Sequence, residues 1–132
     1  MCLGVYLASN VSLDLIPFRE SAPGFNVTDL ESFEVRVRQI LTREFVYALG
    51  AHTHCGCGFR SESDDDSERV ARSRRELSAF VSDAVTNGPV ELYTCWNGDA
   101  GAEPTQVLEL SRDELQSQDH WLIEGSLIRV RS

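Results

Sequence analysis

The sequence contains no lysine, so all 12 of its basic residues are arginines. Without lysine the chain cannot form a side-chain Schiff base or supply the lysine of a P-loop. It also has no apolar run near the ~18 residues that cross a bilayer. The N-terminus lacks the basic start, apolar stretch and small-residue cleavage site of a secretion signal. We therefore expect a soluble protein of the reducing cytoplasm that binds no membrane.

The formal net charge is −9, from 12 basic and 21 acidic residues. A surface of this sign repels phosphate backbones and acidic lipids, so we expect no nucleic-acid binding. A basic protein partner fits the charge better. No serine-centred elbow, Walker loop or dinucleotide fingerprint occurs, so the sequence carries no complete catalytic motif.

A chain of 132 residues, 42% of them hydrophobic, is long enough to bury a core without the help of a disulfide or a metal. No internal repeat and no linker rich in proline, glycine or serine divides it. We therefore predict one domain over residues 1–132. The most biased segment is RSESDDDSE at residues 60–68, which we predict to be an acidic surface loop.

The clearest secondary-structure signal is a helix that follows this acidic segment. Apolar residues recur at helical spacing through residues 70–85. Asp65 is expected to cap the start of the helix, and Asn87-Gly88-Pro89 to end it. Strand-like segments flank the helix at residues 44–50 and 90–96. A strand, a helical crossover and a second strand predict a right-handed βαβ unit with parallel strands.

The remaining segments favour an α+β domain. Further strands are predicted at residues 2–8, 13–18, 25–30, 105–111 and 126–131. The segment 105–111 follows an Asn-Gly turn, so we expect it to pair antiparallel with 90–96. Residues 29–41 fit a strand or a helix, and we prefer a helix because Thr28 and Glu31 form a capping box before it. A second short helix is predicted from Ser111. The predicted fold is a mixed, mostly antiparallel sheet with one main helix packed on a face and one βαβ crossover.

The nine residues AHTHCGCGF, at 51–59, concentrate the side chains that carry chemistry. They include His52, His54, Cys55 and Cys57. A continued strand would point the histidines and the cysteines to opposite faces of the sheet. The glycines around the cysteines favour a loop instead, in which these side chains can converge. Because parallel strands end at one edge of a sheet, Cys95 is expected nearby, and so is Cys2 if the first strand runs antiparallel.

Two chemical hypotheses follow for this cluster. The first is a tetrahedral zinc site with ligands drawn from Cys2, His52, His54, Cys55, Cys57 and Cys95. The second is a reactive thiol, in which Cys55 or Cys57 attacks an electrophile while a histidine, His54 or His52, takes the proton. Removal of Met1 would give a further nucleophile, because Cys2 would then carry its own α-amine as a base.

Two alternatives without chemistry stay open at this point. The cysteines can be small half-buried hydrophobic residues beside glycines that shape a turn. The protein can also be a non-catalytic acidic module that recognises a basic partner, as inhibitors and immunity proteins do. The sequence itself does not decide between a site and either alternative.

Overall fold

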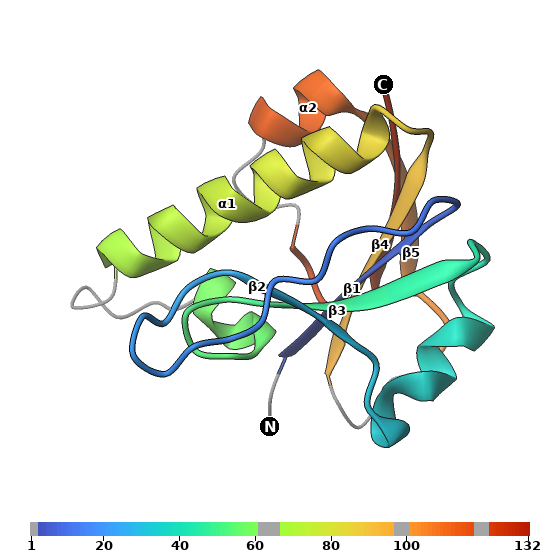
Figure 1. Ribbon diagram of the computed structural model, residues 1–132. Helices are drawn as coiled ribbons and strands as arrows, with labels where there is room; N and C mark the ends of the chain where they lie inside the picture. The colour runs from blue at the N-terminus through green and yellow to red at the C-terminus, as the bar shows by residue number, and fades with distance from the viewer. Residues whose placement is uncertain (1–2, 61–66, 97–100, 118–121) are drawn as a thin grey trace.

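The computed structural model describes residues 3–60, 67–96, 101–117 and 122–132. Six strands form one sheet, with helices on both of its faces (Figure 1). The strands are β1 (Leu3–Ser9), β2 (Asn26–Asp29), β3 (Phe45–Gly50), β4 (Val90–Trp96), β5 (Gln106–Ser111) and β6 (Ser126–Arg131). The helices are η1 (Ser32–Gln39) and η2 (Gly56–Phe59), both of the 3-10 type, and α1 (Ser67–Val85) and α2 (Arg112–Ser117). The α+β class predicted from the sequence is confirmed.

The sheet has the strand order β2-β3-β1-β4-β6-β5. β1 lies between β3 and β4 and pairs antiparallel with both, so β3 and β4 run in the same direction. The chain passes from β3 to β4 through α1, which is the helical crossover that the sequence predicted. The ends of β3 and β4 therefore lie at one edge of the sheet, beside the start of β1.

The predicted neighbour of β4 was wrong. The strand β5 does not pair with β4, because β6 takes that place and pairs antiparallel with it. β5 lies outside β6 and runs parallel to it, with α2 in the connection between them. Burial explains the order, since β6 buries residues on both faces at its start, whereas β5 exposes Val107 and Glu109. A half-exposed strand suits the edge of a sheet.

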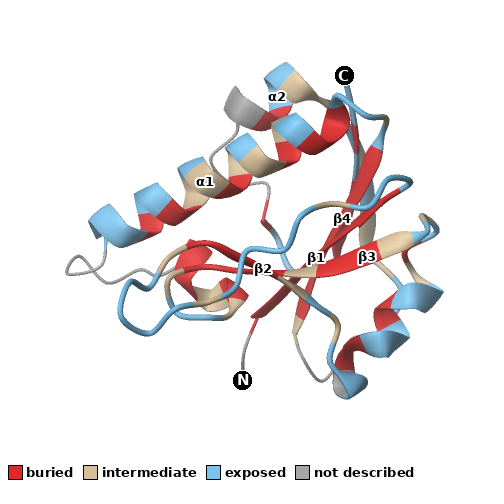
Figure 2. Cartoon of the chain, in the orientation of Figure 1, coloured by how far each residue is buried: buried red, intermediate tan, exposed pale blue. Residues whose placement is uncertain are grey.

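Two hydrophobic layers hold the helices to the sheet. Buried residues of α1 pack on one face of the sheet, and Val37 of η1 packs on the other. β1 and most of β4 are buried on both faces, which Figure 2 shows as continuous red along these strands. On α1 the red residues face the sheet and the exposed ones face outward, as the helical spacing of the apolar residues predicted.

The ambiguous segment at residues 29–41 is helical, as preferred, but the helix is of the 3-10 type and begins later than expected. Thr28 does not cap it, because Thr28 belongs to β2 and pairs with Ala48. Glu31 is the cap instead, and its backbone N–H donates to Oε1 of Glu34 at 3.0 Å. This shift places two carboxylates, Glu31 and Glu34, at the start of η1.

Other predicted boundaries have mixed outcomes. The end of α1 is confirmed, since Gly88 adopts φ 130° and its N–H donates to the Val85 carbonyl at 3.1 Å. Residues 13–18 do not form the predicted strand within the described part, where Ile16 makes a single bridge to Val27. The expected cap Asp65 and most of the acidic segment 60–68 lie outside the described residues.

A buried carboxylate on β4 supports the turn that leads into β3. Glu91 is 1% exposed. Its Oε1 atom accepts hydrogen bonds from the Thr42 N–H at 2.7 Å, the Thr42 hydroxyl at 3.0 Å and the Arg43 N–H at 3.1 Å. Charge-assisted bonds of this kind offset the cost of burying the carboxylate.

Candidate functional site

The chain leaves β3 at Gly50 and forms a tight turn rather than a longer strand. The Ala51 N–H donates to the Cys55 carbonyl at 3.0 Å, and the His54 N–H donates to the Ala51 carbonyl at 2.9 Å. The Asn26 carboxamide donates to the Ala51 carbonyl at 3.1 Å, which fastens the turn to β2. His54 adopts φ 70°, a left-handed conformation that histidine tolerates better than most residues. The loop that the glycines predicted is present.

After the turn, η2 packs against the start of β1. A Cβ atom on Gly56 would lie 2.6 Å from the Leu3 carbonyl oxygen, so only glycine allows this approach. The sulfur of Cys57 accepts a hydrogen bond from the Leu3 N–H at 3.2 Å. The thiol of Cys57 therefore satisfies the first N–H of β1, which is a structural role.

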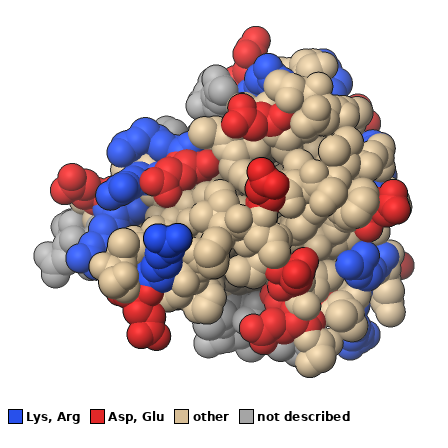
Figure 3. All heavy atoms as spheres, in the orientation of Figure 1, with Lys and Arg blue, Asp and Glu red and all other residues tan. Residues whose placement is uncertain are grey.

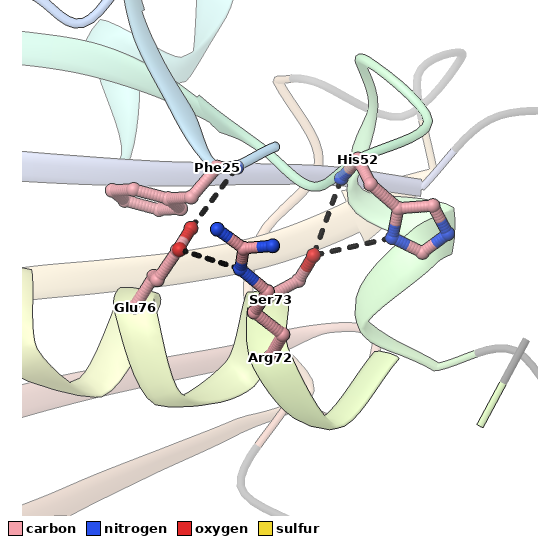
Figure 4. A network of polar contacts seen from close by, with 5 residues as sticks. All are labelled: Phe25, His52, Arg72, Ser73 and Glu76. Carbon is pink, nitrogen blue, oxygen red and sulfur yellow. Dashed lines mark hydrogen bonds and ion pairs between the residues drawn. The ribbon is translucent and has the colours of Figure 1, made fainter. Parts of the chain in front are cut away.

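The two histidines of the turn have different surroundings. His52 lies toward α1, where Ser73 Oγ accepts the His52 backbone N–H at 3.3 Å and lies 3.2 Å from Nδ1 of the ring (Figure 4). Beside it on α1, Glu76 accepts the Phe25 N–H at 3.3 Å and an Arg72 N–H at 3.3 Å. His52 therefore joins a network that ties the turn and the segment before β2 to α1.

His54 and Cys55 both line a cavity of about 200 Å³ at the sheet edge, which we name the Cys55 cavity. The ring of His54 stacks on Phe18, with centroids 4.2 Å apart and planes at 6°. The lining residues are Leu3, Gly4, Val5, Asn26, Thr28, Glu31, Glu34, Ala48, Leu49, Gly50, His54, Cys55 and Gly56. The cavity thus joins a thiol, an imidazole and two carboxylates drawn from the turn and from η1.

Thr53 contacts the sulfur of Cys55. Its hydroxyl oxygen lies 3.6 Å from the Cys55 Sγ and 3.1 Å from the Cys55 carbonyl oxygen, and it accepts the Gly58 N–H at 3.1 Å. A threonine hydroxyl has one proton to donate and two lone pairs to accept with. While it donates to the carbonyl it can accept from the thiol, and by rotating it can donate to a thiolate. The carbonyl keeps its bond from the Ala51 N–H in either case.

The predicted ligand set does not come together within the described ranges. Cys95 is 3% exposed and packs in the hydrophobic layer beneath η1, where it lies among Tyr6, Tyr93 and Leu127. No group of three or more His, Cys, Asp or Glu side chains arranged to hold a metal occurs among residues 3–60, 67–96, 101–117 and 122–132. Cys2 lies outside these ranges. Zinc binding therefore stays a prediction.

Sequence reasoning missed Glu34, which lines the Cys55 cavity, and Tyr6, which is buried beside Glu34. Tyr6 is fully buried, and its hydroxyl makes no hydrogen bond with the described residues. A Cβ atom on Gly4, which lines the cavity, would lie 2.5 Å from this hydroxyl. Burial first, and then the adjacent Glu34 carboxyl, raise the pKa of the Tyr6 phenol above its ordinary value. No sequence motif indicates this pair, because Glu34 and Tyr6 come together only when η1 packs over β1.

Comparison with protein-family models, curated proteins and solved structures found no match. Within the described parts of the chain, no helix has both the length and the apolar character needed to span a membrane. On the face drawn in Figure 3, carboxylates are scattered and arginines gather over the first half of α1. The basic partner expected from the net charge of −9 thus stays a prediction with no acidic patch on that face to support it.

Proposed function

We propose that the protein acts through the thiol of Cys55 on a small electrophilic molecule held in the Cys55 cavity. The observation that carries this proposal is that Cys55 and His54 line one cavity of about 200 Å³ together with two carboxylates. In the reaction the sulfur adds to the electrophilic carbon of a double bond, whose π electron pair moves to the neighbouring atom, and the thiol proton passes through the imidazole of His54 to that atom. The stacking of His54 on Phe18 fixes the ring while this transfer takes place.

Thr53 is the positioning residue of this proposal. As the thiol loses its proton, the Thr53 hydroxyl turns from acceptor to donor and so stabilises the thiolate, because hydrogen bonds to charged groups are the stronger ones. Cys57 does not line the Cys55 cavity, and its sulfur accepts the Leu3 N–H where η2 packs against β1. Of the two cysteines in the turn, the proposal therefore selects Cys55.

The test is alkylation of the native protein by iodoacetamide, followed by peptide mapping. Because the chain has no lysine, trypsin cuts only after arginine, which separates residues 1–19, 44–60 and 76–112 into three cysteine peptides. Fragmentation then distinguishes Cys55 from Cys57. We expect Cys55 to react on the order of tenfold or more faster than Cys95, which is buried. Equal rates at the two cysteines would contradict the proposal.

A matched pair of variants tests Thr53. Thr53→Ser keeps the hydroxyl, and we expect its Cys55 to react like the wild type. Thr53→Val keeps the shape but removes the donor, and we expect its Cys55 to react about fivefold more slowly, which corresponds to a loss of about 1 kcal/mol at an exposed position. If Thr53→Val reacts as fast as Thr53→Ser, the hydroxyl does not support the thiolate.

A further inference from the structure

An open groove runs along one side of α1, between this helix and the segment that leads into β2. Its larger part has a volume of about 590 Å³ and is lined mostly by apolar residues, and its smaller part, of about 140 Å³, ends at His52. Both parts are lined by Pro23, Gly24, Arg72 and Glu76, so they form one continuous groove, which we name the α1 groove. The described residues that line it are different from those that line the Cys55 cavity.

The middle of the α1 groove exposes apolar side chains. Ile16 is 39% exposed, Ala79 is exposed, and Phe80 is only partly buried. The ring of Phe80 packs against that of Phe25, with centroids 5.5 Å apart. Removal of apolar surface from water is the main favourable contribution to most protein association. This strip therefore favours an occupant with large apolar side chains.

The walls of the α1 groove are fixed by hydrogen bonds of the protein itself. Ile16 and Val27 exchange two backbone hydrogen bonds, at 2.9 and 2.8 Å. Glu76 accepts the Phe25 N–H and the Arg72 Nε–H, each at 3.3 Å, as Figure 4 shows. A groove that is already formed binds a partner at a smaller cost in conformational entropy than one that must first be ordered.

The two ends of the α1 groove carry opposite charges. Arg69 lines the end beside His52, and Asp83 lines the other end. Neither forms an ion pair with a residue in the described part of the chain. Between them, Arg72 and Glu76 pair with each other at 3.3 Å. The groove is therefore apolar in the middle, basic at one end and acidic at the other.

The spacing of these charges selects the kind of occupant. At about 1.5 Å per residue, Arg69 and Asp83 lie roughly 21 Å apart along the helix axis, which suits a chain better than a small ligand. The end at His52 is too small for a helix, which is about 10–12 Å wide. An extended chain advances about 3.3 Å per residue, so roughly seven residues span the two charges. A second copy of this chain is disfavoured, because two molecules of net charge −9 repel each other.

We infer that the α1 groove binds an extended segment of a partner protein that presents a basic residue, two apolar residues and an acidic residue along one edge. The basic residue pairs with Asp83, the apolar side chains cover Ile16, Ala79 and Phe80, and the acidic residue pairs with Arg69. Alternate residues of an extended chain point to the same side, so these four take every second position of the segment. The inference goes beyond the proposed function, because it concerns a different surface.

The experiment is an NMR titration of the ¹⁵N-labelled protein with the peptide acetyl-Lys-Ser-Phe-Ser-Leu-Ser-Glu-amide. We expect saturable shifts at the amides of Gly24, Ala79 and Asp83, which line the α1 groove, and none at Gly4 and Gly56, which line the Cys55 cavity. The control peptide has glutamine at both ends and should bind about fivefold more weakly, because it lacks both exposed ion pairs. Absence of saturation with the first peptide, or equal affinities for the two peptides, overturns the inference.

A charge reversal tests the acidic end of the groove. Asp83→Arg should weaken binding of the lysine peptide about tenfold and should instead favour a peptide with glutamate at both ends. Asp113→Arg, an exposed position on α2, changes the net charge equally and is the matched control. It should not change the preference between the two peptides. Equal preferences in the two variants overturn the inference.

A second pair of variants tests the apolar middle. Ala79→Gln places a longer polar side chain in the α1 groove and should weaken peptide binding about fivefold or more. Ala71→Gln is the same change at another exposed position of α1, and it should leave the affinity unchanged. Equal affinities in these two variants overturn the inference. Dimerisation of the free protein that Ala79→Gln abolishes would identify a second copy as the occupant and would also overturn it.

Discussion

Tyr6 and Tyr93 lie opposite each other on β1 and β4 and differ in one hydrogen bond. The Tyr93 hydroxyl donates to the Ala102 carbonyl at 2.7 Å, whereas the Tyr6 hydroxyl has no partner in the described part of the chain. Both residues are almost completely buried, Tyr6 at 0% and Tyr93 at 1% exposed. The two tyrosines therefore allow a matched test of what an unsatisfied hydroxyl costs this fold.

We predict that Tyr6→Phe raises the free energy of unfolding. Removing a buried hydroxyl without a partner recovers its desolvation cost of about 1–3 kcal/mol. The void left by one oxygen atom subtracts roughly 0.3 kcal/mol. The net gain of about 0.7–2.7 kcal/mol corresponds to a Tm higher by about 2–10 °C for a chain of this size. Tyr93→Phe loses a made hydrogen bond, so we expect it to lower the free energy of unfolding by about 1 kcal/mol.

The difference should grow at alkaline pH. Burial and the Glu34 carboxyl raise the pKa of the Tyr6 phenol, so the folded protein keeps a proton that the unfolded chain releases near the ordinary pKa of 10.0. Below that pH the Tyr6 phenol is protonated in both the folded and the unfolded state, so its ionisation does not affect the free energy of unfolding. Above it, the free energy of unfolding falls by about 1.4 kcal/mol per pH unit until the folded protein also releases the proton. Phenylalanine has no such loss.

Urea and thermal unfolding followed by circular dichroism measure these changes, at neutral pH and again above pH 10. A Tyr6→Phe protein that is less stable than the wild type at neutral pH by as much as Tyr93→Phe would refute the reasoning. It would mean that the Tyr6 hydroxyl has a hydrogen-bond partner in the folded protein.

Three further substitutions test contacts that hold the fold together. Glu91→Ala should lower the free energy of unfolding by about 2–3 kcal/mol, because three hydrogen bonds end on its carboxylate; in urea unfolding, a loss below about 0.5 kcal/mol would be incompatible with this role. Ser73→Ala should lower the free energy of unfolding by about 1 kcal/mol. It should also speed hydrogen exchange of the His52 amide, because this amide donates to the Ser73 hydroxyl. An unchanged exchange rate would argue against that hydrogen bond. Gly88→Ala should lower the free energy of unfolding by about 1–2 kcal/mol, because the φ of 130° at this position disfavours any side chain. Gly24→Ala is the control and should be nearly neutral, since a Cβ atom there meets no close neighbour. Equal effects of the two variants in thermal unfolding would show that Gly88 is not under this constraint.

Much of the fold could be predicted because its signals are local. The helical spacing of α1, its end before Gly88 and the apolar and aromatic residues of β3 and β4 depend on a few neighbouring residues each. The position of β6 between β4 and β5 could not be predicted, since it follows from which strand buries more surface against the whole sheet. The cap of η1 was misplaced for a similar reason, because Thr28 is engaged in the ladder with β3.

The candidate site was predicted in its location and only partly in its composition. The glycines indicated a loop, and the shared direction of β3 and β4 indicated the edge of the sheet where Cys55 lies. The alternation of side chains along β4 puts Cys95 in the hydrophobic layer beneath η1, and no local pattern shows on which face the turn will lie. Glu34 and Tyr6 could not be predicted, because they are distant in sequence and meet only after η1 packs over β1.

The reactivity of Cys55 tests most directly whether the Cys55 cavity holds a nucleophilic thiol. In the native protein, iodoacetamide should alkylate Cys55 on the order of tenfold or more faster than Cys95, which is buried. Equal alkylation rates at Cys55 and Cys95 would contradict a nucleophilic thiol at this site.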